Sequence, residues 1–163
     1  AYAVTIDGAA FLGNEAGYGT TTGVGNGGAV QLNAIGSIYA GGLTFTNNHL
    51  CGNEGQYGGG LYLSSIYNGS DLSNNVLQSN IARSSGGGAF LYSSYTLSFE
   101  NNTVVGNAAT TGGGLYLQTT AADLNNNIFF DQRGGDGVYG SSATALSANP
   151  TIAIDGRPLA TCT

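Results

Sequence analysis

The sequence predicts an all-β protein, a right-handed parallel β-helix (β-solenoid) of about six coils of about 27 residues each. Residues 1–163 are expected to form this solenoid as a single domain, since one core serves a chain of that length. Three observations lead to this prediction. The composition is rich in glycine and poor in charge, two asparagine motifs recur with glycine clusters, and short apolar runs alternate with period two.

The composition favours an ordered chain with many tight turns. Glycine occurs 29 times, and charged residues make up 7% of the chain, against about 25% in an ordinary globular domain. Disordered chains combine low hydrophobicity with high charge, whereas this chain is 41% hydrophobic. Glycine loses the most backbone entropy on folding, so its abundance indicates turns or close backbone approaches that need it.

Charge and hydropathy exclude two classes of partner. The net charge is -6 and only three arginines, with no lysine, supply positive charge. Phosphate recognition needs clustered basic side chains, so no nucleic-acid partner is expected. No apolar run reaches the length of a membrane span, and no membrane insertion is expected. The absence of lysine and the many Gly, Asn, Ser and Thr residues favour an extracellular or cell-surface location.

Paired asparagines form the first repeated motif. They recur at spacings of 27, 27 and 25 residues, as Asn47-Asn48, Asn74-Asn75, Asn101-Asn102 and Asn126-Asn127. Asparagine tolerates the left-handed backbone conformation better than most residues. Each pair therefore predicts a turn with one left-handed asparagine, and the stacked side chains are expected to hydrogen-bond from coil to coil.

A second motif and a glycine cluster complete each unit. The motif ends in Asn14, Asn53, Asn80 and Asn107, with Gln132 in a degraded fifth copy. The glycine clusters open apolar runs at Gly27-Gly28-Ala29-Val30, Gly59-Gly60-Leu61-Tyr62, Gly87-Gly88-Ala89-Phe90, Gly113-Gly114-Leu115-Tyr116 and Asp136-Gly137-Val138-Tyr139. Equal offsets between the motifs predict that 61–63, 89–91 and 115–117 stack as parallel strands.

Each unit then holds three short strands that cannot bury an apolar face alone. Stacking the units about 4.8 Å apart makes one continuous core, and such connections are overwhelmingly right-handed. Alternation predicts three inward columns: Ala29, Leu61, Ala89, Leu115 and Val138; Phe45, Leu72, Phe99 and Leu124; and Phe11, Leu50, Leu77, Val104 and Phe129.

These motifs resemble the GGA[ILV] and FxxN repeats of the chlamydial polymorphic outer membrane proteins. Gly27-Gly28-Ala29-Val30 fits the first motif, and 11–14, 45–48 and 99–102 fit the second, whereas Leu72 and Leu124 replace phenylalanine in other copies. The resemblance spans roughly residues 9–140. It implies a right-handed β-helical surface protein of the kind that serves as an adhesin or secreted passenger.

Glycosidases use two carboxylates about 5–10 Å apart, so two aspartates are candidates for a catalytic pair. Asp71 and Asp123 are predicted to share an outward column with Thr44 and Ser98, two coils or about 9.6 Å apart. That distance suits an inverting pair, but Ser98 lies between them and no basic residue aligns nearby. We expect a solvated polar column, no catalytic residues and no enzyme activity.

Metal and cofactor sites are not expected. His49 is the only histidine, follows Asn48, and is predicted to lie in a turn at the surface. Asp131 and Asp136 flank glycines, which allows a calcium loop, although a turn without metal is the expectation because EF-hand spacing is missing. Cys51 and Cys162 either form an intramolecular disulfide, stay free, or pair between chains.

Aromatic residues supply the candidate binding site. The position after the inward residue of the glycine-led strand reads Val30, Tyr62, Phe90, Tyr116 and Tyr139. Tyr62, Phe90, Tyr116 and Tyr139 are thus expected to form an exposed stripe, one ring per coil. The stripe is interpreted either as cross-strand stacking or as a contact face, and the two are compatible.

The ends of the stack favour association. Strands at the end of a solenoid expose unpaired backbone groups, and both 1–6 and 151–154 are apolar runs that favour strands. The sequence therefore predicts end-to-end self-association, or pairing with neighbouring repeats of a longer chain. The expected function is that of a non-catalytic extracellular β-solenoid serving as a structural, adhesive or self-assembling surface module with a possible cell-surface or glycan partner. The alternative is a carbohydrate-binding or polysaccharide-cleaving β-helix protein.

Overall fold

The computed structural model describes residues 3–17, 25–36, 42–67 and 69–141, together with the backbone of strands 145–149 and 152–154. All regular structure in these ranges is β-strand. The described residues include no helix of the length and hydrophobicity needed to cross a membrane.

The nineteen short strands of the described residues pair only in parallel and form four sheets. The first sheet contains β1 (Val4–Asp7), β4 (Leu43–Thr46), β8 (Ser70–Ser73), β12 (Leu97–Glu100), β15 (Ala121–Asn125) and β18 (Ala145–Asn149). The second sheet contains β2 (Ala10–Leu12), β5 (His49–Cys51), β9 (Val76–Gln78), β13 (Thr103–Val105), β16 (Ile128–Phe130) and β19 (Ile152–Ile154). The third sheet contains β3 (Val30–Asn33), β7 (Leu61–Ser64), β11 (Ala89–Tyr92), β14 (Leu115–Gln118) and β17 (Val138–Ser141). The remaining two-stranded sheet pairs β6 (Glu54–Tyr57) with β10 (Ile81–Ser85).

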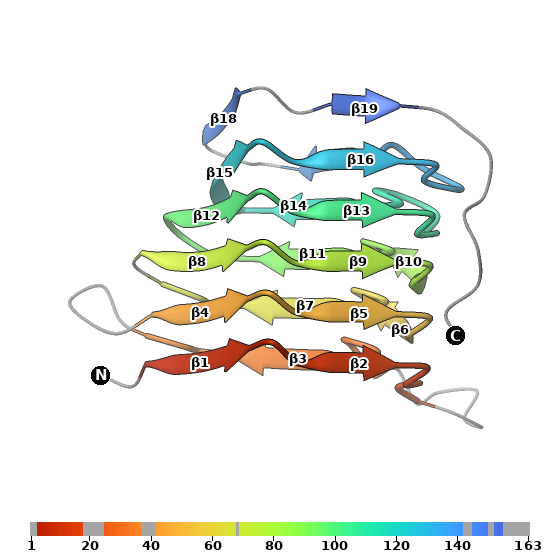
Figure 1. The fold of residues 1–163 in the computed structure, drawn as a ribbon, viewed down its shortest axis with the longest axis horizontal. Coiled ribbons are helices and arrows are strands. Elements are labelled where there is room, and N and C mark those ends of the chain that lie inside the picture. Colours follow the sequence, from red (N-terminus) through yellow and green to blue (C-terminus); the bar gives the residue numbers. More distant parts are fainter. Residues whose placement is uncertain are drawn as a thin grey trace.

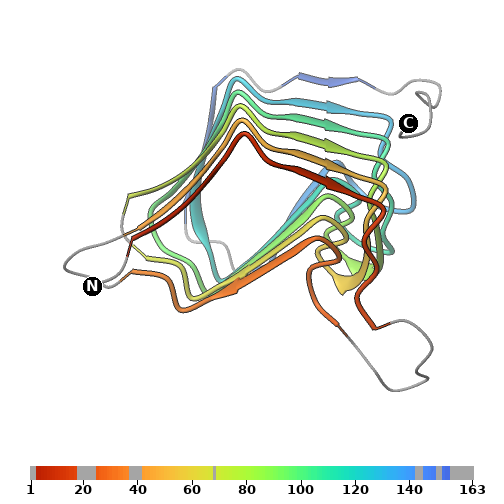
Figure 2. The same cartoon turned by 60° about the horizontal axis from the view of Figure 1, so that its bottom comes forward.

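The chain winds as a right-handed parallel solenoid, which confirms the predicted fold class. In Figure 1 the strands of the first two sheets run left to right in front, those of the third sheet run back behind them, and the chain climbs from β1 to β19. Figure 2 shows successive coils following nearly the same outline. The third sheet has five strands, so the complete turns are slightly fewer than the six predicted coils.

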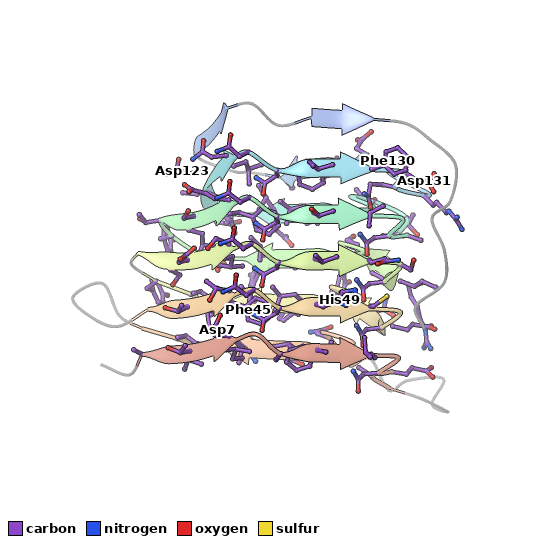
Figure 3. The ribbon with its side chains drawn as sticks, in the orientation of Figure 1. Asp7, Phe45, His49, Asp123, Phe130 and Asp131 are labelled. Atoms are coloured by element: carbon purple, nitrogen blue, oxygen red, sulfur yellow. The ribbon has the colours of Figure 1, made fainter. Side chains whose placement is uncertain are left out.

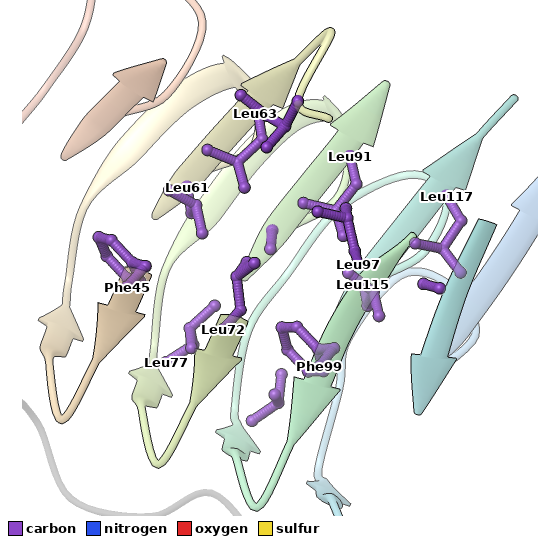
Figure 4. Packing of buried hydrophobic residues seen from close by; sticks show 14 of the residues in the cluster. Phe45, Leu61, Leu63, Leu72, Leu77, Leu91, Leu97, Phe99, Leu115 and Leu117 are labelled. Carbon is purple, nitrogen blue, oxygen red and sulfur yellow. The ribbon is translucent and has the colours of Figure 1, made fainter. Parts of the chain in front are cut away.

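The interior is filled by stacked aliphatic and aromatic side chains (Figure 4). The predicted neighbours Leu61, Ala89 and Leu115 pair directly across β7, β11 and β14. Phe45, Leu72, Phe99 and Leu124 form a second column, and Leu50, Leu77, Val104 and Phe129 a third, all of them buried. At the two ends of the columns, Phe11 and Val138 are only partly buried.

Ala29 packs against the core as predicted, but its predicted register within the inward column is wrong. Val30, not Ala29, pairs with Leu61, and Ala29 instead lies opposite Gly60, to whose carbonyl both Ala29 N and Val30 N donate at 3.1 Å. The three-glycine copy Gly58-Gly59-Gly60 shows why. Ala29 occupies the place of Gly60, the third glycine of this cluster. The prediction aligned Ala29 with Leu61, the inward residue that follows the glycines, and so shifted the register by one residue.

The glycine clusters are needed because neighbouring coils approach closely there. A Cβ atom on Gly59 would lie 2.4 Å from Ile81 C and 2.5 Å from Gly87 O, both backbone atoms. No larger residue fits without moving the main chain of the next coil. The clusters therefore let the turn before each third-sheet strand stack directly on the next turn.

The paired asparagines form the predicted turn. The first member of each pair is left-handed, with φ of 57° at Asn47, 58° at Asn74, 55° at Asn101 and 52° at Asn126. The second member points inward and is buried. Asn75 N and Nδ2 both donate to Asn102 Oδ1, at 2.9 and 3.0 Å, and the same pattern links Asn48 to Asn75 and Asn102 to Asn127. This ladder satisfies polar groups that burial would otherwise leave unpaired.

A second ladder runs through the asparagines that end the other motif. Asn53 N and Nδ2 donate to Asn80 Oδ1 at 3.0 and 2.9 Å, and Asn80 does the same to Asn107. Gln132 closes the described part of the ladder by accepting from Asn107 N at 3.1 Å. The 27-residue spacing was visible in the sequence, but the hydrogen bonding of this second set was not predicted.

Cys51 is fully buried and disulfide-bonded. The alternative of a free thiol is therefore wrong for this residue. Cys162, the other cysteine of the sequence, lies outside the described residues, as do Asp155, Arg157 and Pro158 of the C-terminal run.

Candidate functional site

The aromatic column lies on the outer face of the third sheet. Tyr62, Phe90, Tyr116 and Tyr139 pair in register from coil to coil, as predicted. Their ring centroids are 5.5, 4.8 and 5.0 Å apart in that order, with interplanar angles of 15°, 4° and 25°. The rings therefore stack on one another along the solenoid, and cross-strand stacking is part of their role.

The column begins one residue later than predicted in the first coil. Tyr62 pairs with Gln31, and Val30 points into the core with 8% exposure. This follows from the same one-residue shift that places Ala29 opposite Gly60. The aromatic column thus ends at Tyr62, with an amide side chain beyond it.

The expected exposure of the stripe is wrong for Phe90. Its side chain is 4% exposed, whereas Tyr139 is 37% exposed. Phe90 is covered because the rings of Tyr62 and Tyr116 lie on its two faces and Tyr57 packs edge-on at 5.2 Å and 62°. Tyr57 is the last residue of β6, which belongs to the two-stranded sheet and not to the third sheet. Alternation along one strand could therefore not reveal this contact.

A hollow of about 270 Å³ opens beside this column and is lined by Asn26, Tyr57, Tyr62, Phe90, Tyr92 and Gln118. We call it the tyrosine hollow. Burial raises the pKa of the Tyr62 phenol. Tyr92 was not predicted as a site residue, although its position two residues after Phe90 puts it on the same face of β11.

The two aspartates take the predicted column. Asp71 and Asp123 each pair with Ser98, and Thr44 pairs with Asp71. Two coils separate the aspartates, or about 9.6 Å at the usual strand spacing. Every other described member of this column is Thr or Ser, and Arg83, on the coil of Asp71, is engaged by Glu54 and Glu15.

His49 does not lie in the turn. It is the first residue of β5 and half-buried, pairing with Ala10 and Val76. The predicted turn ends at Asn48, one residue earlier. The Nε2 atom of His49 is buried and has no hydrogen-bond partner among the described residues. Figure 3 shows His49 on the second sheet, well apart from Asp123 on the first.

Asp131 lies in a turn after β16, with a left-handed φ of 51°. Its Oδ2 is 3.7 Å from Arg133 Nη2, an ion pair too long for a hydrogen bond. Asp136 is exposed. Within the described ranges, no three His, Cys, Asp or Glu side chains gather in a way that could hold a metal ion.

The N-terminal end of the stack is a second feature of interest. β1, β2 and β3 are the outermost strands of their three sheets at this end. The inward side chains there are only partly buried, Ile6 and Phe11 among them, whereas their counterparts Phe45 and Leu50 are fully buried. The first coil therefore presents backbone edges and part of the apolar core to its surroundings.

The sequence matches no protein-family model, no curated protein and no solved structure.

Proposed function

We propose that this chain is a non-catalytic extracellular structural module that associates end to end with further copies of itself. The observation that carries the proposal is the N-terminal end of the stack, where three parallel sheets and the core stop at one coil. Unpaired strand edges invite the addition of another strand. Burial of the apolar side chains there stabilises the contact by about 25 cal/mol per Å².

The backbone of β1 has one side available for pairing. Val4 N donates to Gly42 O and Gly8 N to Thr46 O, each at 3.0 Å, so these groups face the second coil. Successive backbone N–H groups of a strand point to opposite sides, so the N–H of Thr5, the residue after Val4, faces away from β4. An added strand would accept that hydrogen.

A second copy fits this edge for geometric reasons. The opposite end of the stack is formed by β18, β19 and β17, which belong to the same three sheets and run in the same direction. The last coil of one copy therefore offers parallel strands to the first coil of another. Such a head-to-tail contact does not close on itself and builds a linear assembly. Asp7 is the only charged residue in β1, β2 and β3, so little repulsion opposes the contact.

The non-catalytic and extracellular parts of the proposal have separate support. Ser98 separates Asp71 from Asp123 in their column, and their other described neighbours there are Thr44 and Ser147. The disulfide at Cys51 is typical of proteins in an oxidising compartment. The resemblance to the repeats of chlamydial polymorphic outer membrane proteins points the same way, with Phe45 and Phe99 inward and Asn48 and Asn102 in the ladder.

Sedimentation velocity over a range of protein concentrations tests this proposal. We expect wild type to sediment as concentration-dependent oligomers. Thr5→Pro removes the outward N–H of β1 and should shift the protein to monomers, whereas Thr5→Val keeps that N–H and should still assemble. A melting curve for each variant shows that it is folded. Monomers at every concentration of wild type, or equal assembly of a folded Thr5→Pro, would contradict the proposal.

A further inference from the structure

The tyrosine hollow lies on the side of the solenoid and is built by residues of four successive coils, the first included. Asn26 comes from the first coil, Tyr57 and Tyr62 from the second, Phe90 and Tyr92 from the third, and Gln118 from the fourth. Tyr92 pairs with Gln118, and Phe90 with Tyr62. The position of each side chain is therefore set by the register of the sheet.

The floor of the hollow is aromatic and held firmly. Phe90 is 4% exposed and is packed between the stacked ring of Tyr62 and the edge-on ring of Tyr57. Tyr92, by contrast, is 38% exposed at the rim. A ligand in the hollow would therefore meet a fixed apolar surface with one adaptable ring beside it.

The polar groups of the hollow are all uncharged. Three phenols and two carboxamides line it, and none of the described lining residues is acidic or basic. Hydroxyls and amides both donate and accept hydrogen bonds. The phenol of Tyr62, like any tyrosine, is protonated at neutral pH and can donate a hydrogen bond.

We propose that the tyrosine hollow binds a neutral saccharide unit. A sugar ring combines an apolar C–H face, which suits Phe90 and Tyr92, with hydroxyls that match the phenols of Tyr57 and Tyr62 and the amide of Gln118. The hollow is just below the roughly 300 Å³ at which pockets for larger ligands begin, so one or two sugar rings fill it. This inference is independent of end-to-end association.

The same lining disfavours other ligands. An anionic sugar would need a basic partner, and the net charge of the chain is -6. A cationic ligand would lack a carboxylate in the hollow. A wholly apolar ligand would leave phenols and amides without hydrogen bonds, which is costly on burial.

Tyrosine fluorescence provides a direct test, because the chain contains no tryptophan. Cellotriose, maltotriose and chitotriose are titrated as neutral probes, with trigalacturonate as the anionic probe. We expect at least one neutral trisaccharide to saturate the signal with a Kd between about 0.1 and 10 mM, and trigalacturonate to bind at least about tenfold more weakly. No binding of any neutral probe, or tighter binding of trigalacturonate, overturns the proposal.

Two exposed tyrosines three residues apart make the matched variants. Tyr92 lines the hollow, while Tyr95, 49% exposed, stacks on Tyr67 elsewhere. Tyr92→Ala should weaken neutral-sugar binding about tenfold, the loss of a hydrogen bond and a ring contact, and Tyr95→Ala should leave it unchanged. Both variants should keep the wild-type sedimentation behaviour. Equal effects of the two substitutions on folded protein would place the sugar elsewhere and overturn the assignment.

Discussion

Asn48 and Asn75, 27 positions apart in the sequence, are joined by two hydrogen bonds inside the solenoid. Asn48 N and Asn48 Nδ2 both donate to Asn75 Oδ1, at 2.9 and 3.1 Å. Asn75 Nδ2 in turn donates to Phe45 O at 2.8 Å. One side chain thus connects a turn to the backbone of the preceding coil and to its own counterpart there.

Replacing Asn75 with alanine should destabilise the protein by about 3 kcal/mol, because buried backbone and amide groups lose their partners. Asn74→Gly is the control, since Asn74 is exposed and its φ of 58° suits glycine. It should change stability by less than about 1 kcal/mol. Urea denaturation measures both, and equal losses would contradict the structural role of the ladder.

Gly59→Ala should be more disruptive than Gly13→Ala. A Cβ atom on Gly59 would press on the backbone of the next coil, whereas one on Gly13 would meet nothing within 4 Å. Gly13→Ala should cost about 1–2 kcal/mol for its left-handed φ of +61°. Gly59→Ala should cost about 3 kcal/mol or prevent folding. Thermal melting ranks the two, and a near-wild-type melt of Gly59→Ala would show that the coils are not so closely stacked.

The raised pKa of Tyr62 predicts a loss of stability in alkali. The unfolded chain releases this proton near pH 10, before the folded chain does, so the stabilisation is complete below that pH and is lost as the pH rises through the folded pKa. The urea midpoint should therefore fall as the pH rises above about 10. Tyr62→Phe should fall less steeply over the same range, and parallel curves would rule out a shifted Tyr62.

The double substitution Asp71→Asn and Asp123→Asn tests the non-catalytic proposal. Their column contains Thr44 and Ser98, so neutral polar residues fit there and the melting temperature should change little. A reducing-end assay on polysaccharide substrates should show no activity in wild type or variant. Activity in wild type that disappears in a folded variant would reverse the proposal.

The stacking could be predicted because the motifs constrain each coil at several points. The spacing of the paired asparagines sets the length of a coil, and their turn geometry and the alternation of Leu97, Ser98 and Phe99 then assign inside and outside. The predicted register of Ala29 failed because its cluster was aligned by the alanine. The glycine contacts between coils, invisible in one sequence, set the true register.

In the candidate site, the aromatic column could be predicted from the sequence, but the burial of its members could not. One position per coil identified Tyr62, Phe90, Tyr116 and Tyr139, and the structure stacks them. The burial of Phe90 depends on Tyr57 from another sheet, and contacts between sheets leave no trace in the alternation of one strand. His49 was misplaced because the length of a turn is not encoded in its asparagines alone.

Electron microscopy of the purified wild-type protein tests end-to-end association most directly. Stacked copies should form filaments with an axial repeat of about 25–35 Å, the height of five to seven coils about 4.8 Å apart. Thr5→Pro should abolish these filaments. Single, unassociated particles of wild type at every concentration examined would contradict the account.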